Sequence, residues 1–165
     1  VGISTLVGRA LGSGRVDDAL AVVSAAKRLL LGYTAVLAAF FFLIPDTILG
    51  FFIPADGGAE YADVLRYGRV LLRLVAVYVF FDSLYMTYVG ALKGAGDTRF
   101  IMGSIALVAL VCMVAPVTIG VMVFNAGLYY CWSCAAVFIF ALFCLTAGRY
   151  RQGRWQQMRV IEAGA

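Results

Sequence analysis

Long apolar stretches separated by short polar turns make up most of this chain of 165 residues. A stretch of about 20 such residues is long enough to cross a lipid bilayer as a helix. The pattern predicts four complete membrane-spanning helices, near residues 21–44, 70–92, 101–124 and 128–147. The apolar runs are continuous and do not alternate with polar positions, which excludes a membrane β-barrel.

The composition agrees with a membrane protein, because 64% of the residues are hydrophobic and 13% are charged. Soluble domains are about a quarter charged, and no soluble core of this length could bury so much apolar surface. In lipid, only helices or closed barrels satisfy the backbone polar groups. The predicted fold class is therefore all-α: a polytopic membrane helix bundle with about four complete transmembrane helices plus the end of a truncated one.

The beginning of the chain is typical of the end of a further span. Val1 to Leu11 is apolar but only about half as long as a membrane-crossing helix, and the first residue is not Met. We therefore expect a fragment of a longer protein. Residues 1–15 would form the end of the truncated span and its turn, residues 16–148 the transmembrane bundle, and residues 149–165 a basic tail.

The first complete span is predicted to end at Pro45 and Asp46, where proline interrupts the apolar run. Asp46 is expected to cap a short interfacial helix at Thr47–Phe52, because Asp favours the position just before a helix. Pro54–Gly58 is expected to form a loop.

Pro116 is predicted to kink the third span and to free a backbone carbonyl near Cys112. Asn125–Gly127 then forms a tight hairpin between the third and fourth spans. After the fourth span, Tyr150 and Trp155 are expected to lie at the membrane interface, where such amphipathic rings are common.

The basic residues indicate how the chain is oriented in the membrane. Four of them lie in residues 1–28, two in residues 93–100 and four in the tail, whereas the loops on the other side hold two, Arg66 and Arg69. Ten against two places the first loop, the second glycine-rich turn and the tail in the cytoplasm, in a protein of the cell (inner) membrane. The net charge of +4 therefore reflects membrane orientation and not binding of nucleic acid.

Two glycine-rich turns share one spacing. The first contains Gly8, Gly12 and Gly14, and the second contains Gly90, Gly94 and Gly96 followed by Asp97. Both end helices on the side assigned to the cytoplasm. Glycines four residues apart allow helices to approach closely in lipid, so these turns are predicted to be structural.

Asp82 is an acidic residue within the second apolar span, and an acid at this depth is costly unless it has a function. In a helix, Tyr78, Tyr85 and Met86 share its face. An ionised carboxylate is poorly solvated there, so Asp82 would hold a proton or bind Na⁺ with help from hydroxyl and carbonyl oxygens. Either event removes its charge and permits a conformational change, as a coupling-ion site in a secondary transporter requires.

Asp82 and Tyr78 are therefore candidate coupling-cation residues, with Na⁺ as a possible metal ligand of Asp82. Tyr85 and Met86 are candidate walls of a substrate cavity, because aromatic surfaces beside one carboxylate suit small organic cations. The alternative is that Asp82 pairs with Arg73, which lies nine residues away and about half a turn out of phase, or with a residue outside this chain.

Other chemistry has little support. The chain contains no histidine, and it shows no paired acids or nucleophile motif that would indicate an enzyme. Cys131 and Cys134 have the spacing of a redox motif, but they open a membrane helix and not a βα unit. The four cysteines, Cys112, Cys131, Cys134 and Cys144, are predicted to be small packing residues. We expect no cofactor beyond a coupling H⁺ or Na⁺.

The motif from Gly90 to Arg99, GALKGAGDTR, resembles the signature of the multidrug and toxic compound extrusion (MATE) family. The segment from Val7 to Arg15, VGRALGSGR, resembles the other cytoplasmic turn of that family, which follows the second helix of each lobe. The order of turns, spans and hairpin also fits, over essentially the whole chain. The likeness is to the C-terminal lobe, from the end of helix eight to helix twelve.

The resemblance implies two six-helix lobes around a central cavity that exports substrates by antiport with H⁺ or Na⁺. The family's acid on helix ten lies twelve positions before the first glycine of the G-x-G turn, and Asp82 stands twelve before Gly94. Tyr78 stands where Na⁺-coupled relatives carry a tyrosine. The resemblance places a second acid of the cation site in the missing N-terminal lobe. The expected partners of this chain are that lobe, the lipid bilayer and small organic, cationic substrates.

Two other functions remain open. A lipid-linked oligosaccharide flippase of the same superfamily would need basic residues in its cavity. The lipid-embedded part of the first span is expected to begin near Leu29, after Lys27 and Arg28, so Arg73, near the outer end of the second span, is the one intramembrane base. A non-transporting membrane subunit would tolerate replacement of Asp82 by asparagine. An ATP-driven permease is not among them, because it would need a nucleotide-binding partner and the sequence contains no phosphate-binding loop.

Overall fold

The computed structural model describes residues 2–52 and 60–157, and within these ranges the chain is helical and contains no strand. Four helices are long and apolar enough to cross a membrane: Val16–Leu43, Asp63–Gly94, Thr98–Phe124 and Leu128–Arg151. The predicted fold class, an all-α bundle with about four helices long enough to span a membrane, is thus confirmed. The elements in chain order are α1 (Gly2–Gly12), α2 (Val16–Leu43), α3 (Pro45–Gly50), α4 (Glu60–Gly94), α5 (Thr98–Val108), the π-helical turn η1 (Ala109–Val114), α6 (Ala115–Phe124), α7 (Leu128–Arg151) and the 3₁₀ turn η2 (Arg154–Gln157).

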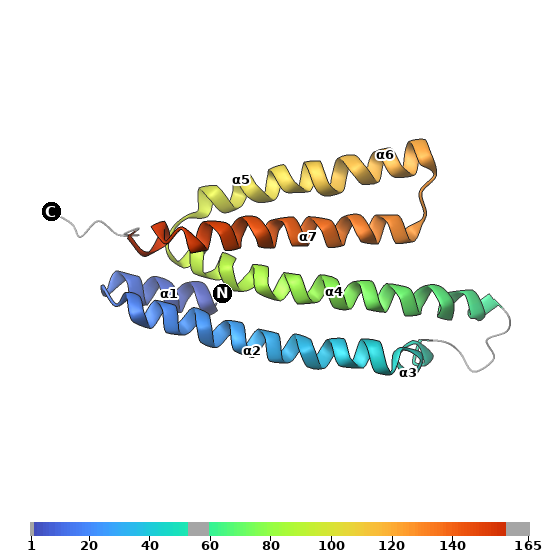
Figure 1. Cartoon of the computed structure of the whole chain (residues 1–165), viewed down its shortest axis with the longest axis horizontal. Coiled ribbons are helices and arrows are strands. Elements are labelled where there is room, and N and C mark those ends of the chain that lie inside the picture. Colours follow the sequence, from blue (N-terminus) through green and yellow to red (C-terminus); the bar gives the residue numbers. More distant parts are fainter. Residues whose placement is uncertain (1, 53–59, 158–165) are drawn as a thin grey trace.

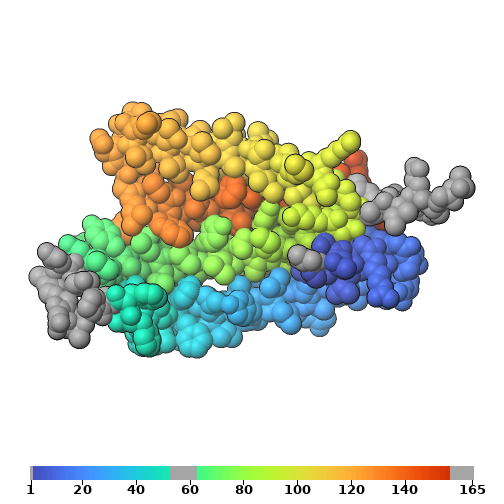
Figure 2. Space-filling model, turned by 180° about the vertical axis from the view of Figure 1, so that it is seen from behind, coloured from blue at the N-terminus to red at the C-terminus, as the bar shows by residue number. Residues whose placement is uncertain are grey.

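Helix α4 is the central element, packed against α2 on one side and against α7 on the other (Figure 1). Helices α5 and α6 continue through η1 as one long rod that runs beside α7. The short helix α1 lies against α2 and α4 at one end of the bundle. Seen from behind, α5 and α6 form one edge of the molecule and α2 the opposite edge (Figure 2).

The two ends of the bundle differ in their connections. We call the end that holds residues 8–15, 94–97 and 148–153 the glycine-turn end, and the end that holds α3 and residues 125–127 the hairpin end. At the hairpin end, Asn125 adopts a left-handed conformation (φ 49°), and the N–H of Ala126 bonds the carbonyl of Gly120 over 2.9 Å. The tight hairpin predicted there is confirmed.

Aromatic rings form the contact between α4 and α7. The ring of Phe81 meets the rings of Phe140 and Phe143 at centroid distances of 4.9 and 5.8 Å. Closer to the glycine-turn end, Tyr88 meets Tyr150 at 5.0 Å. Edge-to-face and tilted ring pairs of this kind contribute more than their buried area alone, so these rings hold α4 against α7 over the stretch from Phe81 to Tyr88.

The structure corrects the prediction that Trp155 lies at the membrane interface, because its side chain is 1% exposed. Gly153 takes a left-handed conformation (φ 70°) and turns the chain back into η2. The indole of Trp155 then stacks on Tyr150 at 4.9 Å and donates its N–H to the Tyr150 carbonyl over 3.0 Å. The ring is therefore part of the core and has its polar atom satisfied within the chain.

The structure also corrects the role predicted for Asp46. Helix α3 begins at Pro45, with Ile44 as its N-cap and no side-chain capping bond. Proline is well suited to the first helical position, so Asp46 lies inside the helix, where its carboxylate pairs with Arg69 of α4 over 2.5 Å. The loop predicted for Pro54–Gly58 lies outside the described residues.

The third span contains a π-helical turn where a kink was predicted. The N–H of Ala115, just before Pro116, bonds the carbonyl of Leu110, five residues back. In a regular α-helix, residue 116 would donate to the carbonyl of Cys112, but proline has no N–H and its ring collides with that carbonyl. The wider turn makes room for the proline ring.

Candidate functional site

The residues of α4 divide into faces with different neighbours. Phe81 and Tyr88 face α7, whereas Gly90 and Gly94 face α1. Successive residues of a helix differ by about 100° around its axis. Asp82 therefore lies about a quarter of a turn from both of these faces, on a strip of α4 that neither contact uses.

Asp82 is partly buried near the middle of the second span. Its carboxylate makes no hydrogen bond and no ion pair with any residue in the ranges 2–52 and 60–157. Arg73, the intrahelical partner that sequence spacing left open, is exposed to the surroundings of the bundle and does not pair with it. The acid thus has no counter-charge in the part of the chain that the structure describes.

Tyr78 and Tyr85 flank Asp82, one turn before it and one turn after it. Tyr85 is 6% exposed and belongs to the hydrophobic core, and Tyr78 is partly buried against the same core. Met86 is 51% exposed and points away from it. The structure therefore brings the acid and its two phenols onto one strip, while Met86 lies beside that strip on an open surface.

The two glycine-rich turns have the same backbone geometry. In the first, Arg15 donates its N–H to the carbonyl of Ala10 over 2.9 Å, and in the second Asp97 donates to Leu92 over 3.0 Å. Gly14 and Gly96 stand in the left-handed conformation, with φ of 73° and 87°. Both turns are Schellman-type helix ends, in which glycine takes the position that other residues adopt only with strain. The repeated spacing in the sequence thus encodes a repeated turn.

Glycine also allows α1 and α4 to touch through their backbones. A Cβ atom added to Gly94 would lie 2.6 Å from the Ser4 carbonyl oxygen, and one added to Gly8 would lie 3.1 Å from the Gly94 carbonyl oxygen. A Cβ on Gly90 would meet the side chain of Ile3 at 2.9 Å. Gly12, in contrast, has open space around it. These glycines therefore serve packing of two helices at the glycine-turn end.

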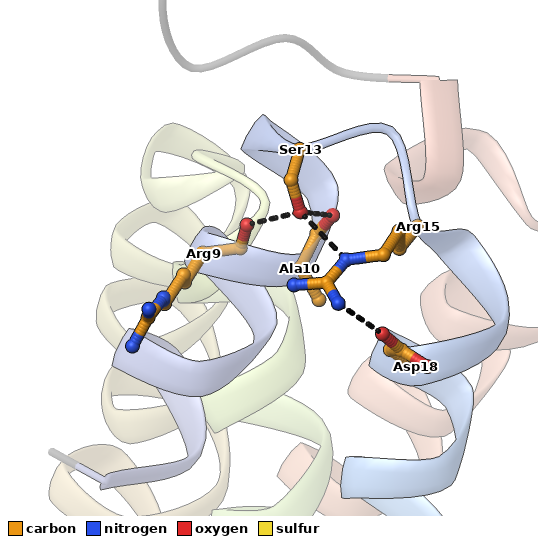
Figure 3. A network of polar contacts seen from close by, with 5 residues as sticks. All are labelled: Arg9, Ala10, Ser13, Arg15 and Asp18. Atoms are coloured by element: carbon orange, nitrogen blue, oxygen red, sulfur yellow. Dashed lines mark hydrogen bonds and ion pairs between the residues drawn. The ribbon is translucent and has the colours of Figure 1, made fainter.

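Polar contacts stiffen the turn between α1 and α2 (Figure 3). The Ser13 hydroxyl donates to the carbonyls of Arg9 and Ala10, each over 3.0 Å. Arg15 donates its Nε–H to the Ser13 oxygen over 3.1 Å and pairs through Nη1 with Asp18 over 3.2 Å. Asp18 lies in the first turn of α2, where a negative charge complements the helix dipole.

An ion pair between Asp97 and Arg149 joins the second glycine-rich turn to the end of α7. Arg149 Nε lies 2.7 Å from Asp97 Oδ2, and the two side chains are only 19% and 9% exposed. The guanidinium also lies 5.0 Å from the ring centre of Phe100 and donates to Gln152 over 3.3 Å. Sequence reasoning placed Asp97 in a structural turn but missed Arg149. The available signal was that the fourth span ends with an arginine on the side of the membrane where this turn lies.

The described residues contain no cluster of three or more cysteine, histidine, aspartate or glutamate side chains that could hold a metal ion. The four cysteines are free thiols. Any Na⁺ at Asp82 would therefore draw its other ligands from hydroxyl and carbonyl oxygens or from elements other than those described.

In a comparison with family models, the model described as MatE matches residues 1–122. The matched region includes both glycine-rich turns and all of the candidate residues on α4, and it ends within α6. Neither the curated proteins nor the solved structures give a match to the chain.

Proposed function

Because the chain belongs to the MatE family of transporters, we propose that it forms part of a secondary active efflux antiporter for small organic, cationic compounds. An inward gradient of H⁺ or Na⁺ drives export, and Asp82 is the carboxylate that binds the coupling cation. The protein works in the cell (inner) membrane, with the glycine-rich turns and the C-terminal tail in the cytoplasm.

The single observation that carries this proposal is the unpaired carboxylate of Asp82 on α4, away from the contacts that Phe81 makes with α7 and Gly90 makes with α1. An intramembrane acid that only stabilised the bundle would be expected to pair with a base or a backbone group. Among residues 2–52 and 60–157, Asp82 has no such partner. Its proton or its Na⁺ therefore provides the missing neutralisation, and release of that cation restores the charge.

Neutralisation of Asp82 by the coupling cation gives the carrier two states, which differ in the environment that the Asp82 side chain favours. With the cation bound, the strip around Asp82 is electrically neutral and can be enclosed in a low-dielectric environment at little cost. Without it, the charged acid favours access to water or to a cationic substrate. Tyr78 supplies a hydroxyl oxygen one turn away that can complete a Na⁺ site, and the exposed side chain of Met86, one turn after Asp82, lines the path of the substrate. A second lobe of the same protein supplies the opposite wall of the cavity.

The test measures dye efflux from vesicles that contain the full-length protein, under imposed gradients of H⁺ or of Na⁺. Asp82→Asn keeps the shape of the side chain but removes its charge, so gradient-driven efflux should fall to the level of empty vesicles. Asp63→Asn is the matched control, because Asp63 is an exposed acid on the same helix, and this variant should transport like the wild type.

Gradient-driven efflux that is unchanged in Asp82→Asn would overturn the coupling role. Wild-type efflux no greater than that of empty vesicles would favour a non-transporting subunit. Dependence of wild-type efflux on only one of the two gradients identifies the coupling ion. Transport of lipid-linked oligosaccharide without any dependence on either gradient would favour the flippase.

A further inference from the structure

We propose that the third span contains a hinge at Ala109–Val114 and that the contact with Tyr130 on α7 holds α6 in position. We call α5, before the hinge, the inner half of this span, and α6, after the hinge, the outer half. The proposal rests on the geometry of this span and not on the transported substrate or the coupling ion. It concerns residues that have no part in the Asp82 strip.

The two halves of the third span are anchored very differently. In α5, the side chains of Ile101, Ser104 and Val108 are buried in the bundle. In α6, all of whose residues the structure describes, Gly120 is the one buried residue. Met122, for example, is 80% exposed. The inner half is therefore held by side-chain packing over its whole length, whereas the outer half has little side-chain packing of its own.

The π turn lies between these two halves. A π turn contains one extra residue per hydrogen-bonded loop, which weakens the regular ladder and permits the helix to change direction, and such turns occur often at functional sites. Pro116 follows immediately and prevents the regular i→i−4 bond at its own position. The backbone is thus weakest where the well-packed half ends, and a change of direction at this point moves α6 without disturbing α5.

Tyr130 makes the contact that holds α6 in place. Its hydroxyl donates a hydrogen bond to the carbonyl of Pro116 over 3.1 Å. Its ring lies against Gly120, where an added Cβ would come within 2.2 Å of the Tyr130 Cε1 atom. Pro116 and Gly120 are four residues apart and so lie on one face of α6. The side chain of Tyr130 therefore contacts α6 at two positions that are one helical turn apart.

This arrangement makes the position of α6 depend on one hydroxyl and one ring. Loss of the hydroxyl removes the polar half of the contact, and a side chain at residue 120 would push the ring away from the helix. Both changes act on α6 alone, because Tyr130 is in the first turns of α7 and α5 is held by its own core residues. The remainder of the bundle should keep its packing.

The experiment measures distances between spin labels in the full-length protein in lipid nanodiscs, with the native cysteines replaced. An outer pair joins Met122 on α6 to Leu43 at the end of α2, and an inner pair joins Met102 on α5 to Leu29 on α2; all four side chains are strongly exposed. In Tyr130→Phe, the distance distribution of the outer pair should broaden and its mean should shift, while that of the inner pair stays as in the wild type. Gly120→Ala should act in the same direction on the outer pair.

Tyr129→Phe is the matched control. It removes the same hydroxyl from the neighbouring residue, whose ring contacts Tyr67 on α4 at 5.4 Å, so both distributions should remain unchanged. The proposal fails if Tyr130→Phe leaves the outer distribution as in the wild type. It also fails if the inner and outer pairs shift together, because the third span would then move as a rigid rod. Tyr130→Phe keeps the ring on Gly120, so it remains informative even if Gly120→Ala does not fold.

Discussion

Replacement of Gly94 by alanine tests the backbone contact between α1 and α4 most directly. The added Cβ would lie 2.6 Å from the Ser4 carbonyl oxygen and 3.1 Å from the Gly8 nitrogen. Both neighbours are main-chain atoms of one helix, so no side chain can rotate to relieve the clash. An ordinary contact begins near 3.4 Å, and α1 must therefore move away by about 0.8 Å.

The expected loss of stability follows from two opposing effects. Overpacking of a close contact costs about 1–3 kcal/mol. Replacing glycine by alanine within a helix gains up to about 1 kcal/mol, and the gain is smaller here because Gly94 is the last residue of α4. We expect a net loss of about 1–2 kcal/mol, which corresponds to a lower unfolding temperature by several degrees.

Thermal unfolding of the purified protein in detergent, followed with a thiol-reactive fluorescent dye, measures this loss. Cys134 is a buried free thiol that becomes reactive on unfolding, whereas Cys144 is exposed and contributes a constant background. Gly103→Ala is the matched control, because Gly103 lies within α5 and an added Cβ meets nothing within 4 Å. That variant should unfold at the wild-type temperature or slightly above it. If Gly94→Ala is as stable as Gly103→Ala, the two helices do not touch through their backbones.

Two further predictions compare ion pairs of different burial by the same assay. Arg149→Ala leaves the nearly buried carboxylate of Asp97 without its partner and should cost about 1–3 kcal/mol; an unchanged unfolding temperature would contradict the structural role of this pair. Arg69→Ala removes the exposed pair with Asp46 and should cost less than about 1 kcal/mol, with an effect that diminishes further in high salt. A larger and salt-independent loss would show that the Asp46 pair is shielded from solvent.

The spans and the glycine-rich turns could be predicted from the sequence because each depends on a local rule. A helix that crosses lipid needs an uninterrupted apolar run of a certain length, and this chain contains four. Gly14 and Gly96 stand where a helix must end in a left-handed residue, which favours glycine over other residue types. The spacing between Gly90 and Gly94 likewise indicated a close helix contact, although it did not identify α1 as the partner.

Other features depend on contacts between distant parts of the chain, and local rules could not supply them. Asp97 and Arg149 are 52 residues apart, and the sequence around either residue does not identify the other as its ion-pair partner. The sequence predicts a capping role for Asp46 because aspartate favours that position, but Pro45 begins the helix one residue earlier and the carboxylate of Asp46 pairs with Arg69. Trp155 was assigned to the interface from its residue type alone, since its burial depends on the turn at Gly153.

The candidate site shows the same division. The position of Asp82, the shared face with Tyr78 and Tyr85, and the lack of phase with Arg73 all follow from helix periodicity and could be stated in advance. The sequence alone could not predict that Met86 faces outward and Tyr85 inward. The two residues are neighbours, and the packing of α4 against its partners decides which of them is covered. The structure thus separates the two candidate cavity residues that the sequence treated alike.

The third span has buried side chains in α5, whereas Gly120 is the one buried residue of the fully described α6, and this difference bears on how the bundle could move. At the glycine-turn end, backbone touches backbone at Gly94, and Arg149 ties the turn at Asp97 to α7. At the hairpin end, α6 is held to α7 chiefly through Tyr130. Domain and helix motions in transporters need some elements that stay fixed and others that reorient about them. Asp82 lies on α4 between the two ends, so the change in charge that we propose for it would occur between the α1–α4 backbone contact and the sparsely packed α6.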